Sequence, residues 1–207
     1  MKLLRIDSSV RLENSKTRML SDHFLTEFGK KVDFDLKTRD VGISPAPFPT
    51  DEFIKANYTK PDQRTEQMKE VLSTSDTLID ELIEADKVII GSPMYNFSIS
   101  ASLKSYIDNI VRVGRTFALD ENGAMKGLLA GKKVVVITSR GAFSYKSGAA
   151  LESFDFQQSY LTALLNFVGI TDITFVNAEA QDFGQDNVKA TNFEEAKQQL
   201  SELATVW

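Results

Sequence analysis

The sequence predicts an α/β protein in which a five-stranded parallel sheet is covered by helices on both faces. Short apolar runs alternate along the chain with longer segments whose apolar residues recur at helical spacing. Two of these runs, residues 87–91 and 132–138, are nearly continuous β-branched stretches, as in parallel strands buried on both faces. The length of 207 residues, of which 42% are hydrophobic, suits a single domain that spans residues 1–207.

The N-terminal part of the chain alternates strand-like and helix-like segments. Residues 2–6 (KLLRI) form a compact apolar run that indicates a strand. Residues 18–28 carry apolar side chains on one helical face and predict a helix. Residues 32–36 alternate apolar and acidic residues, which predicts a half-exposed strand near the edge of the sheet. Four of the five prolines lie within residues 45–61, which predicts a loop without regular structure.

The rest of the chain continues the same alternation. The apolar spacing of residues 63–84 predicts a helix, although the pattern is interrupted at residues 73–75. Further strands are predicted at residues 87–91, 132–138 and 171–176. Further helices are predicted at residues 100–113, 149–168 and 193–203. The complete order is therefore five strands, each followed by a helix, which is the pattern of a parallel sheet.

Composition excludes several classes of protein. The chain has no cysteine and one histidine, which excludes disulfides, thiolate catalysis and iron–sulfur clusters and predicts no metal site. The net charge of −5 disfavours nucleic-acid binding through a broad basic surface. The N-terminal segment lacks the pattern of a signal peptide, and no apolar run reaches the ~20 residues of a membrane helix. We therefore expect a cytoplasmic protein without a membrane segment.

The loop after the first strand has the chemistry of a phosphate site. In an open α/β sheet, ligands bind beyond the carboxyl ends of the strands. This loop supplies hydroxyl groups and a cation around the start of a helix, from Ser9, Ser15, Lys16 and Thr17. Free N–H groups and the helix dipole there suit one phosphate group, and helix capping by Asn14 or Ser15 is an equally good explanation. The chain lacks both G-x-G-x-x-G and G-x-x-x-x-G-K-[ST], which excludes the dinucleotide fingerprint and the Walker loop.

The loops after the third and fourth strands also have the chemistry of a ligand site. The first of them contains large side chains, Met94, Tyr95, Asn96 and Phe97. Such residues are unusual in an exposed turn unless they pack on a planar, largely apolar ligand or fold back into the core. An isoalloxazine ring is a ligand of this kind. The other loop has the sequence Ser139-Arg140-Gly141-Ala142-Phe143, in which the glycine permits close backbone approach.

These motifs, in this order, resemble the FMN-dependent NADH-azoreductase family of flavodoxin-like oxidoreductases. The likeness covers nearly the whole chain and includes P-M-Y-N-F at residues 93–97, E-N-G at 121–123, T-S-R-G at 138–141 and F-V-G-I-T-D at 167–172. The resemblance implies a doubly wound, flavodoxin-like sheet with strand order 2-1-3-4-5. It also implies bound FMN, NADH or NADPH as the electron donor, a quinone or azo compound as the acceptor, ping-pong hydride transfer and a homodimer.

The resemblance assigns roles to individual residues. It implies that Ser9, Ser15, Lys16 and Thr17 hold the FMN phosphate, that Met94, Tyr95, Asn96 and Phe97 lie beside the flavin, and that Ser139, Arg140, Gly141 and Ala142 contact the edge of its ring. The substrate-pocket candidates are Asn96, Phe97, Leu119, Phe143 and Leu164. No side chain is expected to be catalytic, because the flavin carries the chemistry.

The sequence departs from the family pattern at four of these positions. Lys16 stands where the family often has Gln, and Ala142 where it usually has a second Gly. Leu119 and Leu164 stand where aromatic residues are common, which bears on substrate preference.

Two other classes of protein compete with the enzyme. A flavodoxin-like electron carrier would need an exposed flavin edge, whereas residues 43–61 and 117–127 resemble the walls of a pocket. A flavin-free receiver domain would need an aspartate after the third strand, where Gly91-Ser92-Pro93 stands instead.

Overall fold

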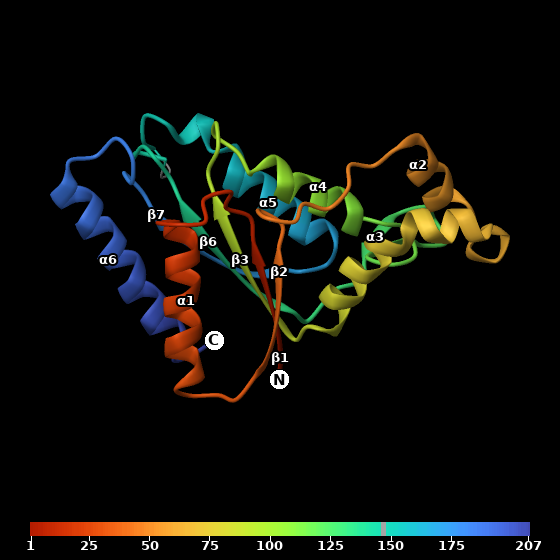
Figure 1. Cartoon of the computed structure of the whole chain (residues 1–207), viewed down its shortest axis with the longest axis horizontal. Helices are drawn as coiled ribbons and strands as arrows, with labels where there is room; N and C mark the ends of the chain where they lie inside the picture. Colours follow the sequence, from red (N-terminus) through yellow and green to blue (C-terminus); the bar gives the residue numbers. More distant parts are fainter. Residues whose placement is uncertain (146–147) are drawn as a thin grey trace.

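The computed structural model describes residues 1–145 and 148–207, and its centre is a five-stranded parallel sheet (Figure 1). The strands are β1 (Lys2–Asp7), β2 (Asp35–Asp40), β3 (Lys87–Pro93), β6 (Lys133–Ser139) and β7 (Asp172–Ala178). Their spatial order is β2-β1-β3-β6-β7, and every neighbouring pair is parallel. This order confirms the predicted 2-1-3-4-5 arrangement of a doubly wound, flavodoxin-like sheet.

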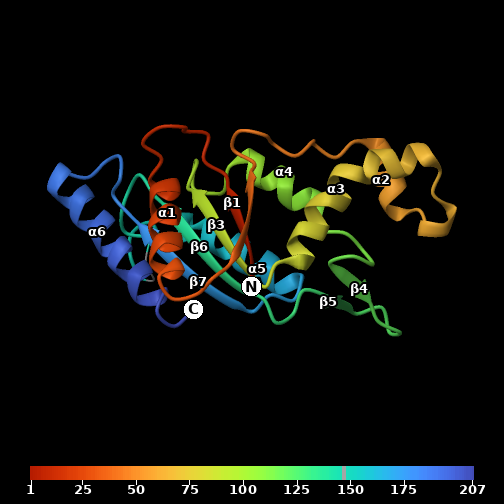
Figure 2. The same ribbon diagram turned by 60° about the horizontal axis from the view of Figure 1, so that its bottom comes forward.

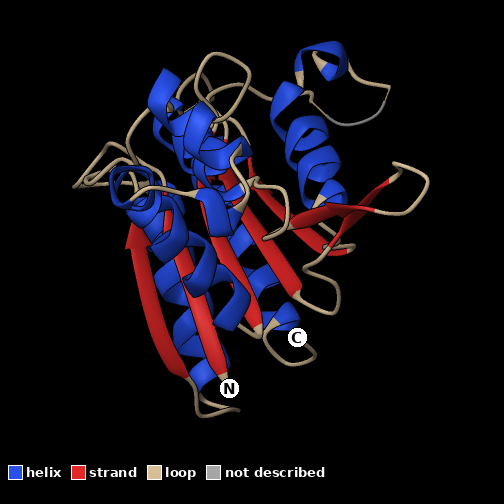
Figure 3. Ribbon diagram, turned by 90° about the vertical axis from the view of Figure 1, so that its right-hand side faces the viewer, coloured by secondary structure: helices blue, strands red, loops and turns tan. Residues whose placement is uncertain are grey.

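Helices cover both faces of this sheet (Figures 1 and 3). One face packs against α1 (Lys16–Gly29) and α6 (Asp186–Leu203), and the other against α3 (Glu66–Glu84), α4 (Ala101–Ile110) and α5 (Phe156–Phe167). Successive side chains of a strand point to opposite faces, so Leu3 belongs to the core under α1 and α6, while Leu4 and Ile6 belong to the core under α3, α4 and α5. None of the described helices combines the length and the apolar character needed to cross a membrane.

The second strand lies further along the chain than predicted. It spans Asp35–Asp40 rather than residues 32–36, because its bounds follow from parallel pairing with β1, in which Lys2 is opposite Asp35. Phe34, which produced part of the alternating pattern, instead packs on Phe28 of α1 with the ring centroids 5.8 Å apart. The prediction that this strand lies at the sheet edge is confirmed.

The proline-rich segment contains a helix, so the prediction of a loop over residues 45–61 is wrong there. This helix, α2 (Asp51–Tyr58), begins after Thr50, whose hydroxyl accepts a hydrogen bond from the Phe53 amide at 3.3 Å. Phe53 and Ala56 are buried against Leu72 of α3. The prolines flank this helix without interrupting it, which is why their number alone was misleading.

The predicted bounds of three other helices also need correction. The helix α3 runs through residues 73–75 without a break, and the hydroxyl of Ser75 donates to the carbonyl of Asn109 in α4. The helix α5 begins at Phe156 rather than at residue 149, after a 3-10 turn (Glu152–Phe154). The helix α6 begins at Asp186 rather than at residue 193, because its polar first turns carry no apolar periodicity.

A small antiparallel hairpin, which the sequence did not predict, lies apart from the main sheet (Figure 2). It pairs β4 (Phe117–Leu119) with β5 (Met125–Gly127). Asp120 organises its turn, because one carboxylate oxygen accepts from the amides of Asn122 and Ala124 at 2.8 Å each. The strands are too short for an alternating pattern to identify them.

Gly127 lies where this hairpin meets the end of α5, and we expect Gly127→Ala to destabilise the fold. A Cβ atom there would lie 2.2 Å from the amide nitrogen of Gly169, so the backbone would have to move. We expect a loss of at least about 1 kcal/mol in the free energy of unfolding, measured by urea denaturation. In the control Gly29→Ala, the added Cβ would lie 3.5 Å from the ring of Phe34, an ordinary contact, so stability should be unchanged or higher. Equal stability of both variants would contradict this account of the hairpin.

Candidate cofactor site

A cavity of about 130 Å³ lies at the carboxyl ends of β1, β3 and β6. It brings together seven of the predicted residues from three separate loops, namely Ser9, Ser15, Lys16, Thr17, Met94, Tyr95 and Ser139. Its lining also includes Arg11, Pro93, Gln181 and Asp182, which were not among the predicted site residues. The structure thus has a cavity at the strand ends, where the strand-end rule predicts a ligand site.

The loop between β1 and α1 supplies the hydroxyl groups of this cavity. Ser15 is the N-cap of α1, and its hydroxyl accepts from the amide of Arg18 at 3.5 Å. The hydroxyls of Ser15 and Thr17 lie 3.4 Å apart, and both side chains are buried. Ser15 thus caps the helix and lines the cavity at the same time, so the two explanations of this loop are compatible. The helix dipole and the hydroxyl donors favour an anion here.

The turn after β3 forms the second wall and has a strained backbone. Tyr95 and Ser98 exchange two backbone hydrogen bonds, at 2.9 and 3.1 Å. The two residues between them, Asn96 and Phe97, have φ values of 48° and 71°, in the left-handed region. Asparagine tolerates this conformation, whereas a bulky aromatic residue there costs about 1–3 kcal/mol, and such strain is concentrated at functional sites. The hydroxyl of Tyr95 accepts from the Val10 amide at 3.3 Å and so joins this turn to the first loop.

The loops after β6 and β7 are paired through their backbones and form the third wall. The amide of Gln181 donates to the carbonyl of Arg140 at 2.9 Å, and the amide of Ala180 donates to that of Ala142 at 2.8 Å. Gly141 permits this pairing, because a Cβ there would lie 2.9 Å from a carboxylate oxygen of Asp182. This pairing explains how Gln181 and Asp182 reach the cavity. Applying the strand-end rule to the fifth strand would have found them.

Several predicted site residues lie outside the lining of this cavity. The side chain of Arg140 is buried on the α5 side, 2.8 Å from Asp155 and 3.5 Å from Glu179, and lines a separate cavity of about 680 Å³. That larger cavity lacks the hydroxyl groups of the β1–α1 loop, and its walls carry three carboxylates, so it is a poor anion site. Neither Gly141 nor Ala142 lines the smaller cavity.

The predicted substrate-pocket residues are also dispersed. Phe97 is partly exposed and packs on Phe154, with the ring centroids 5.1 Å apart. Leu119 and Phe143 are exposed at 55% and 58%, whereas Leu164 packs against the core under α5. Asn96 is exposed in the strained turn. One chain therefore does not bring these five side chains together around a single cavity.

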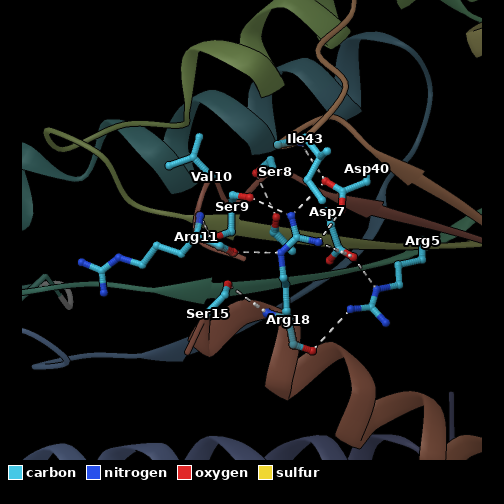
Figure 4. Close-up of polar contacts among 12 residues, drawn as sticks. Arg5, Asp7, Ser8, Ser9, Val10, Arg11, Ser15, Arg18, Asp40 and Ile43 are labelled. Atoms are coloured by element: carbon cyan, nitrogen blue, oxygen red, sulfur yellow. Dashed lines mark hydrogen bonds and ion pairs between the residues drawn. The ribbon is translucent and has the colours of Figure 1, made fainter. Parts of the chain in front are cut away.

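Behind the β1–α1 loop lies a network of charged side chains that the sequence did not predict (Figure 4). Arg18 pairs with Asp40 and with Asp7, and Arg5 also contacts Asp7, at 2.8 Å. Burial raises the pKa of Asp7 above its ordinary value, although Arg5 and Arg18 oppose the shift. Burial acts in the same direction on Asp40, but its hydrogen bonds from Arg18 and from the amides of Ile43 and Gly42 lower its pKa overall.

The family of the chain follows from comparison with known proteins. Residues 1–204 match the model of the family Flavodoxin_2, described as a flavodoxin-like fold. The chain belongs to this family. It is 43% identical to an FMN-dependent NADH:quinone oxidoreductase 2 of Trichormus variabilis, over 99% of each chain. It is 41% identical to an FMN-dependent NADH:quinone oxidoreductase of a Nostoc species, again over 99% of each.

A solved structure agrees with this fold. The FMN-dependent NADH-azoreductase of Bacillus anthracis, in complex with FMN, superposes with a TM-score of 0.84 at 24% identity. The superposition covers 98% of this chain and 99% of the other. At this identity the likeness supports the fold alone.

Proposed function

We propose that this protein is an FMN-dependent NADH:quinone oxidoreductase. The observation that carries the proposal is the cavity at the N-terminus of α1, which is lined by the hydroxyl groups of Ser9, Ser15 and Thr17 among others. These groups fit one terminal phosphate, and the neighbouring strained turn offers apolar side chains to a planar ring. The relatives that are 41% and 43% identical over nearly the full length carry the same activity in their names.

The chain's own residues have distinct tasks in this function. Ser9, Ser15 and Thr17 donate hydrogen bonds to the phosphate, aided by the free amides of the first turn of α1. Residues 94–97 orient the flavin ring and keep water from one side of it. The contacts predicted for Gly141 and Ala142 would come from the backbone of their loop, whereas the amide and the carbonyl of Arg140 are already bonded to Ala178 and Gln181. When bound, FMN supplies the hydride and two-electron chemistry.

The acceptor and the assembly state belong to the same proposal. We propose that quinones, and more slowly azo compounds, are reduced, with NADH or NADPH as donor, by a cytoplasmic homodimer. The exposure of Phe97, Leu119 and Phe143 supports the dimer, because large apolar side chains on the surface are commonly covered by a partner. A second subunit would complete a pocket that one chain leaves open. Leu119 and Leu164 would then shift acceptor preference rather than abolish activity.

We expect one FMN per chain rather than FAD. The first loop offers a site for one terminal phosphate and lacks a glycine-rich turn for a pyrophosphate. Denaturing the purified protein and weighing the released cofactor by mass spectrometry tests this directly. Recovery of FAD, or of no flavin from a protein that also fails to bind added FMN, would overturn the proposed function.

Replacing both Ser15 and Thr17 with alanine should weaken FMN binding by at least about tenfold. Each hydroxyl contributes about 1 kcal/mol to a neutral partner and more to a charged phosphate. The apoprotein should remain folded, which circular dichroism would verify. The matched control is Ser73→Ala on the exposed side of α3, where FMN affinity should not change. An unchanged dissociation constant in the double variant would place the phosphate elsewhere.

Steady-state kinetics should give parallel double-reciprocal lines when NADH and a small benzoquinone are varied against each other. This pattern is expected because donor and acceptor would use the same pocket in turn, with both electrons held on the flavin between them. Intersecting lines would contradict the alternation. A flavin that neither NADH nor NADPH bleaches under anaerobic conditions would favour the electron carrier instead.

A further inference from the structure

The side chain of Arg18, in the first turn of α1, binds two main-chain carbonyl groups of the β1–α1 loop (Figure 4). Its Nη2 atom donates to the carbonyl oxygen of Ser9 at 2.7 Å. Its Nε atom donates to the carbonyl oxygen of Arg11 at 3.2 Å. Both carbonyls belong to residues that line the cavity, so the guanidinium fixes the orientation of two peptide groups in its wall.

Two carboxylates fix the guanidinium in turn. Nη1 and Nη2 of Arg18 form a two-point contact with Asp40, in which Nη2 lies 2.9 Å from Oδ1. Asp7, at the end of β1, lies 3.5 Å from Nη1 and is 3% exposed. Asp40 is itself held by the amides of Gly42 and Ile43, each at 3.1 Å. The guanidinium therefore has little freedom to move, and its charge is compensated before any ligand arrives.

The loop after β2 also keeps the Ser9 carbonyl oriented toward Arg18. A Cβ on Gly42 would lie 2.1 Å from this oxygen, so the loop after β2 packs directly against it. Only glycine leaves room for the approach. The Ser9 carbonyl thus lies between Arg18 and the backbone of residue 42.

We propose that Arg18 is a positioning residue, which draws the carbonyls of Ser9 and Arg11 onto itself so that the loop presents donors rather than acceptors to a phosphate group. A carbonyl oxygen that turned toward a phosphate would repel it, whereas hydroxyl and amide hydrogens attract it. Because Asp7 and Asp40 compensate its charge, Arg18 acts through the shape of the loop. This inference rests on the proposed function, in which the phosphate is that of FMN.

The number and geometry of donors explain why arginine occupies this place. The contacts to two carbonyls and to both oxygens of Asp40 require four N–H groups spread over one plane. Arginine carries five donors in a fixed planar fork, whereas lysine carries three on a single atom. A lysine at this position keeps the positive charge and loses most of the contacts.

The test compares FMN with riboflavin, which lacks the phosphate. Dissociation constants are measured by flavin fluorescence on the apoprotein for the wild type and for Arg18→Lys. We expect Arg18→Lys to weaken FMN binding at least about tenfold and riboflavin binding less than about twofold, since hydrogen bonds that hold the two loop carbonyls are lost. The FMN-to-riboflavin affinity ratio is a readout that a purely structural role would not change.

The control variant is Arg5→Lys, because Arg5 contacts Asp7 and Asp22 in the same network without touching the carbonyls of Ser9 or Arg11. It should leave the affinity ratio unchanged. If Arg18→Lys does not fold, Asp40→Asn keeps the arginine while weakening its support, and the ratio should then fall at least about threefold, in line with one weakened charge-assisted contact.

The possible outcomes separate the inference from the proposed function. An equal loss of affinity for both flavins, or no loss for either, would reject the positioning role and leave Arg18 as a link between β1, β2 and α1. A wild-type protein that binds neither flavin would reject the proposed function instead.

Discussion

The parallel register of β1 with its two neighbours is the constraint on which the site depends. It sets Asp7 opposite Asp40 on one side and opposite Gly91 on the other, so β1 and β2 end at the same level beside the last residues of β3. Ser8 continues this alignment, because its amide and its hydroxyl both donate to the carbonyl of Gly91, at 3.0 and 2.9 Å. A shift by one residue would send Leu3 and Leu4 to the wrong faces and separate the loops that form the cavity.

Along β1, the face toward α1 changes from apolar to charged as the strand approaches the site. Leu3 lies in the core, Arg5 pairs with Asp22 of α1, and Asp7 faces Arg18 of the same helix. Removing charges from water is costly unless each is paired and hydrogen-bonded, so a cluster of this kind adds little to stability compared with an apolar core. It does restrict where the first turn of α1 can lie. That restriction, rather than tighter packing, is what the cluster contributes to the loop, which in the proposed function presents donors to a phosphate group.

The strands of the sheet and their order could be predicted, because buried parallel strands such as residues 132–138 are almost continuously β-branched. The edge strand was predicted three residues too early at its start and four at its end, since its exposed side chains carry no such signal. The hydroxyl-bearing half of the site followed from the strand-end rule. Gln181 lies in the loop after the fifth strand, where the same rule would also have indicated it. Arg18 could not be predicted, because its contacts are to main-chain carbonyls, which leave no pattern in the sequence.

In the turn at residues 95–98, a strained backbone lowers the stability of the fold but places an aromatic side chain beside the candidate site. A two-residue hairpin turn with both central residues in the left-handed region favours Asn-Gly, and here the second position is Phe97. Glycine would remove the strain, but it would also remove the aromatic ring that packs on Phe154 and lies partly exposed beside the cavity residues Met94 and Tyr95. The backbone hydrogen bonds of the turn and the link from Tyr95 to Val10 compensate part of the cost. Strain held by such contacts preorganises the ring, so that in the proposed function a planar flavin would meet a wall that is already in place.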